Sequence, residues 1–319
     1  MLTLGQYGCP PHSRSGCRAG LSSSPLVLFL LYYKENATIN PLEIACDSIE
    51  GTVRSRFVAR EDDILVLRCG FSHIGDDASR AALEVCCTKL ATFVNARQSN
   101  SVNLVMMLNT HARPSDGGLL YKPEKVATLD AMLDTICHGI LFSSLRQSML
   151  FIPCCGGLVK HALREIANAN DRFGSVFAFG APSLDPVLIS NQFIANILYL
   201  SIFGREKVIH AFYRAATVPV LHHTPVFVAI NKCVYRIRIA HLRSRPNGEE
   251  LRCCNQTPQF RKVEKGHTVL YRCQADHHDE LAGTGRYFRV RLLEPEANRR
   301  WIYGEKCDRC IFDVVDYNA

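Results

Sequence analysis

Two stretches of the sequence end in side chains that could carry nucleophilic chemistry. The segment SMLFIPCCGG, residues 148–157, is a short apolar run that stops at Pro-Cys-Cys-Gly-Gly, and VNLVMMLN, residues 102–109, stops at Thr110 and His111. An apolar run closed by turn-forming residues is typical of a buried strand that breaks into a tight turn. A histidine at one strand end and a thiol at another predict a thiol nucleophile with its base, and Cys154 and Cys155 are the candidate nucleophiles.

The same residues are open to a structural interpretation. Cysteine is among the most often buried residue types. Cys154 and Cys155 therefore also fit two small core residues, with His111 in a surface loop.

The segments that must position these residues have the rhythm of an α/β domain. Short apolar runs alternate with stretches in which apolar residues recur at steps of three and four. The expected strands are 64–67, 102–109, 149–152, 175–179 and 225–230, and the expected helices are 78–97, 127–146, 158–168, 189–203 and 206–216. Strands that alternate with helices at this spacing predict a mainly parallel sheet with helices on both faces. We place this domain at residues 61–232, and its strand ends are where such sheets carry their chemistry.

The segments on either side of this domain differ from it in composition and in the pattern of apolar residues. Residues 1–60 begin with a leader rich in Gly, Pro, Ser and Arg, which we expect to be poorly ordered, and continue without a persistent period. Residues 233–319 alternate apolar and polar side chains in several short runs, which is typical of strands with one wet face. We predict a separate, small, Cys-rich β module there.

Composition narrows the class of protein. The chain has 319 residues, of which 47% are hydrophobic and 21% charged, and its net charge of +7 is spread without a dense Lys/Arg run. A soluble globular protein is expected, and nucleic acid is not the expected partner. The apolar run at 25–33 is shorter than the roughly 20 residues that a membrane-spanning helix needs, so no membrane is expected. The 15 cysteines, several in adjacent pairs, predict an intracellular protein, cytoplasmic or nuclear.

The order of these features resembles the caspase-like fold of the clan CD cysteine peptidases and looks most like its CHAT branch. The family's strand ends read His-Gly and Cys-x-x-Gly or Cys-x-Gly, and the matching segments here are 110–112 (Thr-His-Ala) and 153–157. Gly-Ala-Pro at 180–182 resembles the end of the family's next strand. The chain also resembles a set of fungal proteins that carry a Cys-rich C-terminal tail.

This resemblance implies a cysteine endopeptidase that acts on a protein or peptide substrate without a cofactor. Cys154 would attack a peptide carbonyl as a thiolate, and His111 would activate it or protonate the leaving amine. N–H groups of the turn at 154–156, with one near Ala112, would hold the oxyanion. We favour Cys154 over Cys155 because the family leaves one or two residues between the cysteine and the glycine.

Two departures from the family pattern support an alternative function. Ala112 stands in place of glycine, and Pro153 stands in place of a small residue beside the nucleophile. The alternative is a non-catalytic caspase-like scaffold or binding protein with a zinc-ribbon-like tail.

The tail itself predicts a structural zinc site. Zinc favours four tetrahedral Cys and His ligands, and closely spaced pairs position two ligands at once. The candidate ligands are Cys253, Cys254, Cys273, His277, His278, Cys307 and Cys310. The competing interpretation is buried thiols in a small β domain with exposed histidines.

Overall fold

The computed structural model describes residues 24–315, with gaps. The residues outside the description are 1–23, 36–37, 58–59, 99, 242–244, 247, 249–250, 252, 255–257, 265–267, 274–286, 293–298, 305–307 and 316–319. The predicted leader at 1–24 therefore lies almost wholly outside the described residues.

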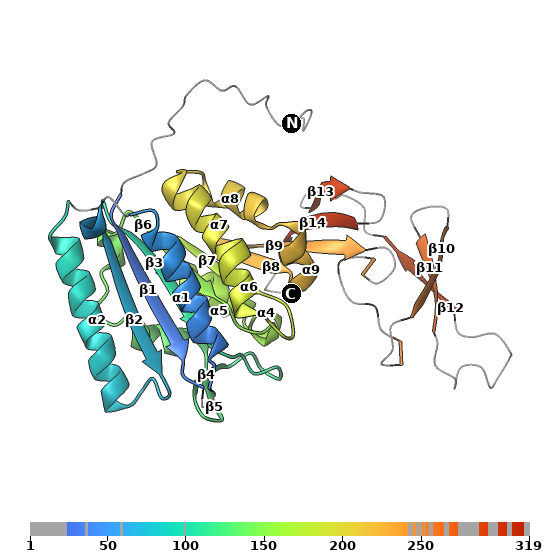
Figure 1. The fold of residues 1–319 in the computed structure, drawn as a ribbon. Coiled ribbons are helices and arrows are strands. Elements are labelled where there is room, and N and C mark those ends of the chain that lie inside the picture. The colour runs from blue at the N-terminus through green and yellow to red at the C-terminus, as the bar shows by residue number, and fades with distance from the viewer. Residues whose placement is uncertain are drawn as a thin grey trace, which may run out of the picture.

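One large mixed sheet organises the protein (Figure 1). Its strand order is β13-β14-β9-β8-β7-β6-β3-β1-β2. Five neighbouring strands are parallel: β2 (Ile64–Phe71), β1 (Leu26–Tyr33), β3 (Asn103–Asn109), β6 (Gln147–Ile152) and β7 (Ser175–Phe179). The next four are antiparallel to their neighbours: β8 (Val226–Ile230), β9 (Cys233–His241), β14 (Asp308–Val315) and β13 (Arg299–Gly304). The predicted α/β class is confirmed.

The strand β1 precedes the predicted domain start at residue 61 and lies inside the large sheet. All eight residues of β1 are buried, and the strand pairs with β2 on one side and β3 on the other. A continuous apolar run is what a parallel strand covered on both faces requires. The segment 26–60, which the sequence pattern left unplaced, supplies this interior strand and the helix α1 (Pro41–Arg54).

The C-terminal region divides at a different place from the predicted residue 233. The strands β9, β14 and β13 extend the large sheet, so its antiparallel half includes residues of the predicted module. A separate three-stranded sheet is formed by β10 (Gln259–Glu264), β11 (Thr268–Arg272) and β12 (Tyr287–Arg291). Its own small core is centred on Val269, Tyr271 and Leu292. A small C-terminal β unit is therefore present, and it is narrower than expected.

The helices cover the faces of the large sheet. In front of the sheet in Figure 1, α1 packs against α6 (Pro186–Ile189), and α7 (Ala195–Ile197) packs against α8 (Val208–Ala215). The remaining helices are α2 (Asp77–Asn95), α3 (Leu129–Ile136), α4 (Gly157–His161), α5 (Leu163–Asn168) and α9 (Val218–His223). Since every residue of β1, β3 and β7 is buried, both faces of the central strands are covered.

Several expected helices differ in extent. The expected helix 158–168 is divided at Ala162 into α4 and α5. The expected helix 127–146 is only α3, which begins after the Thr128 cap and ends before Gly139, whose φ of +80° is not helical. The helix at 186–203 is continuous but contains two π-helical segments, Ser190–Ile194 and Leu198–Phe203. Residues Pro186–Phe203 are long and apolar enough to cross a membrane, with a mean hydropathy of 1.4, yet 56% of this stretch is buried within the protein. A buried core helix has the same composition.

The position of β1 leads to a stability prediction. Phe29 is fully buried in this strand, so replacing it by alanine should lower the free energy of unfolding by about 3–5 kcal/mol through lost burial and the cavity left behind. Urea denaturation of Phe29→Ala measures this loss. The control is Val85→Ala on α2, where the side chain is 53% exposed and a change within about 0.5 kcal/mol is expected. Equal effects in the two variants would contradict an interior role for β1.

Candidate functional site

Three polar residues lie together at the carboxyl ends of neighbouring parallel strands. The ladder between β3 and β6 ends with Met107 beside Phe151. His111 and Cys155 each follow four residues later, and their side chains pair with each other. Tyr32 of β1 lies beside Asn109 of β3, so Glu35 follows β1 at the same level. The chain passes from β1 to β2 on one side and then to β3 on the other. The carboxyl ends of these strands therefore form the topological switch point, where open α/β sheets bind ligands.

Pro153 turns the chain so that the two adjacent cysteines enter different environments. The Cys154 N–H donates to the Ile152 carbonyl at 2.9 Å across Pro153, the pattern of an inverse γ-turn, whose φ suits proline. Cys154 is only 2% exposed, and burial raises the pKa of its thiol far above the usual range. Cys155 is half-buried at the mouth of the site. The structure thus brings Cys155, and not the favoured Cys154, to the histidine.

His111 is held from both its backbone and its ring. Its carbonyl accepts a 2.8 Å hydrogen bond from the N–H of Leu120, next to the hairpin of β4 (Leu119–Lys122) and β5 (Lys125–Ala127). Its Nε2 lies 2.5 Å from the Glu35 carboxylate, and its ring meets that of Tyr33 edge to face at 6.4 Å. A carboxylate on one ring nitrogen fixes the orientation and tautomer of an imidazole.

Glu35 is the functional residue that the sequence analysis missed. It follows a long apolar run without any motif of its own, as part of the segment 1–60 that had no predicted place. The available signal was the run at 26–33 itself. Had it been assigned as a parallel strand, its polar successors would have become candidates for the same edge as His111.

The electrostatics of the site favour a thiolate–imidazolium pair. The side-chain hydrogen bond with His111 is the largest cause of a lowered pKa for Cys155, and it outweighs the opposing effect of burial. The same bond, followed by the Glu35 carboxylate, raises the pKa of His111. A cationic neighbour lowers the pKa of a thiol and so increases the share of the nucleophilic thiolate. The arrangement can therefore supply both a nucleophile and a proton donor.

Two glycines let the thiol turn sit against neighbouring backbone. A Cβ on Gly156 would lie 2.3 Å from the Gly180 carbonyl oxygen, and one on Gly157 would lie 2.5 Å from that of Arg113. Both distances are far below any tolerated contact, so only glycine fits these positions. The turn is thereby wedged between the loop after β7 and the loop that follows His111.

The hydrogen bonds of this turn decide which N–H groups could hold an oxyanion. The N–H of Cys154 is used by Ile152, and the N–H of Gly156 donates to the Ala181 carbonyl at 2.6 Å. The pairing of Ala112 with Leu119 uses the N–H groups of Leu120 and Arg113, so it leaves that of Ala112 outside the ladder. Of the predicted donors, the N–H groups of Cys155 and Ala112 are the ones not engaged by these bonds. Alanine retains the N–H that glycine would supply.

A cavity of about 440 Å³ opens beside Cys155. Its wall includes Lys160 from α4 and Arg236 and Arg238 from β9, and it contains no carboxylate among the described lining residues. Phe227 gives it an apolar side, and the Arg236 guanidinium lies 6.0 Å from that ring. The cavity adjoins the thiol and is lined by cations.

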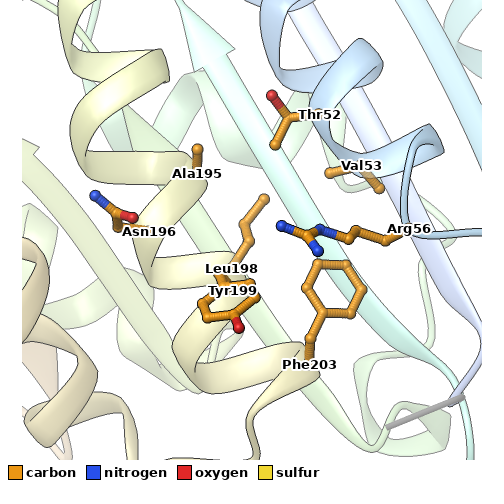
Figure 2. A pocket seen from close by; sticks show the side chains of 8 residues that line it. All are labelled: Thr52, Val53, Arg56, Ala195, Asn196, Leu198, Tyr199 and Phe203. Carbon is orange, nitrogen blue, oxygen red and sulfur yellow. The ribbon is translucent and has the colours of Figure 1, made fainter. Parts of the chain in front are cut away.

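A second hollow, of about 310 Å³, lies between two helices (Figure 2). It sits between the end of α1 and the end of the helix at 186–203, and the Arg56 guanidinium stacks over the Tyr199 ring at 5.0 Å. Both helices follow strands and run back from the edge that carries His111 and Cys155. Its lining has no thiol, imidazole or carboxylate among the described residues, so it carries no candidate chemistry.

Three of the predicted zinc ligands lie together in the C-terminal region. The sulfur atoms of Cys253, Cys254 and Cys273 all lie within 4.8 Å of one another and could hold a metal ion. The neighbouring thiols, Cys273 foremost, raise the pKa of Cys253 to about 11. A metal ion would reverse this preference because it binds thiolates. Of the other candidates, His277, His278 and Cys307 lie outside the described residues, and Cys310 lies in β14 with its side chain outside the description.

Comparisons with known proteins do not assign a family. No protein-family model matches the chain, and no curated protein matches it. What remains is an α/β domain with a mixed sheet whose polar edge brings His111, Cys155 and Glu35 together.

The site predicts that the two adjacent cysteines differ in reactivity. Alkylation by iodoacetamide, followed residue by residue with mass spectrometry, should modify Cys155 with a midpoint below the ordinary thiol value of about 8.5, while Cys154 stays unmodified in the folded protein. The rate should rise with pH through that lowered midpoint, because only the thiolate reacts. In His111→Asn the midpoint should move upward. Preferential modification of Cys154 would contradict the assignment.

Proposed function

We propose that this protein is a cysteine peptidase of caspase-like type, in which Cys155 is the nucleophile. The observation that carries this proposal is the hydrogen bond between the Cys155 thiol and the His111 ring, with Glu35 behind the ring. Nucleophile, base and orienting carboxylate within reach of one another are the signature of nucleophilic catalysis. The resemblance of the two strand-end motifs to the clan CD peptidases adds to it.

Each residue takes a defined role in this mechanism. The Cys155 thiolate attacks the carbonyl carbon of a peptide bond, and the N–H groups of Cys155 and Ala112 donate to the developing oxyanion. His111 protonates the leaving amine, which releases the first product and leaves an acyl-thioester. A water molecule then attacks the thioester while His111 takes a proton from that water. Cys155 leaves as the thiolate. Glu35 holds the His111 ring and stabilises its protonated form.

The cavity beside Cys155 supports a substrate class. Lys160, Arg236 and Arg238 contribute three cationic side chains, and a guanidinium has five donors in a fork that matches a carboxylate. Arg238 is only 3% exposed, so the wall holds it in place. We infer that the cavity takes an acidic side chain of the peptide next to the bond that is cut.

The scaffold alternative draws on Ala112 and Pro153. Neither residue weakens the proposed site in a physical sense. Alanine keeps the backbone donor, and Pro153 forms the turn that exposes Cys155 while burying Cys154. A non-catalytic protein would not need a histidine and a carboxylate aligned on a half-exposed thiol, because such a cluster costs desolvation without contributing to the core.

Cleavage assays on the purified full chain test the peptidase. A library of fluorogenic peptides with Asp, Glu, Asn, Gln, Lys or Arg before the cleaved bond should show a preference for Asp and Glu over their amides of roughly tenfold to hundredfold, the value of a charge-assisted hydrogen bond. Cys155→Ala and His111→Ala should lose activity by about a thousandfold or more. Cys154→Ala is the matched control and should retain it. Wild-type protein that is alkylated at Cys155 but cuts no peptide would favour the scaffold instead.

We propose a second, structural function for the C-terminal thiols: Cys253, Cys254 and Cys273 hold a zinc ion. The convergence of the three sulfur atoms within 4.8 Å favours this site. The three-stranded sheet nearby has a core of few residues, and so small a unit needs an added source of stability. Metal binding supplies folding free energy in such units.

Metal analysis tests this site independently of catalysis. Purified protein should carry about one zinc ion per chain, as a closed structural site does. Cys273→Ser should lose most of it, whereas Cys233→Ser, an exposed cysteine outside the cluster, should keep it. Equal zinc content in the two variants, or none in the wild type, would contradict the proposal.

A further inference from the structure

The loop that follows β7, residues 180–185, is fastened at both ends by two consecutive residues. At its start, the Oγ1 of Thr224 accepts hydrogen bonds from the N–H groups of Gly180 and Ala181 at 3.0 and 2.9 Å. At its end, the Nε2 of His223 accepts from the N–H of Asp185 at 2.8 Å. Thr224 is fully buried and donates its own proton to the Pro225 carbonyl at 2.9 Å. We call His223 and Thr224 the latch.

The loop held by this latch reaches the thiol turn at two points. The Ala181 carbonyl accepts the Gly156 N–H at 2.6 Å, directly after Cys155. The N–H of Leu184 is among the groups that lower the pKa of the Cys155 thiol. The far side of the loop is also tied down, since the Asp185 carboxylate caps α6 by accepting from Val187 and Leu188 at 2.9 and 3.0 Å. A loop of six residues with hydrogen bonds at both ends can adopt few other backbone conformations.

We propose that His223 and Thr224 are positioning residues that hold the loop 180–185 against the thiol turn. Through the Ala181 carbonyl, which accepts the Gly156 N–H, they fix the position of Cys155. This inference rests on the proposed function in taking Cys155 as the nucleophile. Neither latch residue is assigned a part in the chemical steps. They act through the backbone, by holding in place the turn that carries the thiol and the N–H groups that favour its ionised form.

The other charged and titratable groups around the sulfur do not belong to the latch. His111 hydrogen-bonds the sulfur, Glu35 stands behind His111, and Cys154 is adjacent in the chain. Lys160, Arg236 and Arg238 face it from the cavity wall. Substitutions in the latch leave all of these groups in place. A change in the pKa of the Cys155 thiol would therefore come from a change in the position of the loop.

Alkylation kinetics of Cys155 test the latch without requiring peptidase activity. The rate of iodoacetamide modification at Cys155 is measured from pH 5 to pH 10 in the full chain, by quantifying the modified peptide. Thr224→Val removes the hydroxyl and nearly keeps the shape, and His223→Leu removes the ring acceptor. Each should move the midpoint upward and slow alkylation at pH 7 by roughly threefold to tenfold, since a shift of one pH unit is tenfold in thiolate below the midpoint.

Conservative variants separate the latch from general loss of structure. Thr224→Ser and His223→Gln keep an acceptor and should restore the wild-type midpoint, and His222→Leu, at the exposed neighbouring position, should not move it. If Thr224→Val fails to fold, His223→Leu with its glutamine counterpart decides the question on the less buried residue. Midpoints unchanged in His223→Leu would overturn the inference. A wild-type protein with a low midpoint but no cleavage would defeat the peptidase proposal and leave the latch intact.

Discussion

The candidate site depends on the register between neighbouring parallel strands. Backbone hydrogen bonds align β1, β3 and β6. Glu35, His111 and Cys155 follow the carboxyl ends of these three strands and therefore lie near one another. A slip of one residue would turn every side chain of a strand to the opposite face of the sheet. The apolar burial of these strands, complete along β1 and β3, makes such a slip costly. Packing of the core and placement of the chemistry are thus enforced by the same constraint.

Sequence patterns predicted the parts of the fold whose signals are local. The strands at 103–109, 147–152 and 175–179 and the helix α2 lie where their apolar periodicity indicates, because each buries one stripe or one short run. The site was predicted in part, since His111 and the cysteine pair both lie at strand ends. Register is a property of two strands at once, so the choice between Cys154 and Cys155 could not come from either segment alone. Glu35 was not predicted for the same reason: it becomes a candidate for the site only when β1 is known to lie beside β3.

The antiparallel half of the sheet ties the C-terminal region to the candidate site. The strand β9 carries Arg236 and Arg238 into the cavity beside Cys155, and β14 pairs with β9 along its whole length. Gly248, at a φ of +77°, packs closely on the Arg238 side chain. The cavity wall is therefore built partly by residues beyond the predicted α/β boundary, only a few positions before Cys253. The wall of the cavity and the C-terminal segment therefore share a stretch of backbone.

The central place of β1 has a consequence for how the chain reaches its native state. This strand is made first, yet both of its partners come later in the sequence: Leu26 pairs with Ile64 on one side and with Asn103 on the other. Until those segments exist, an eight-residue strand of wholly apolar and aromatic side chains has two open edges, the form most prone to associate with another chain. Pairings between distant segments are also slow to form. During synthesis the nascent chain therefore passes through a stage that invites aggregation, and chaperone protection of the first hundred or so residues would serve it most.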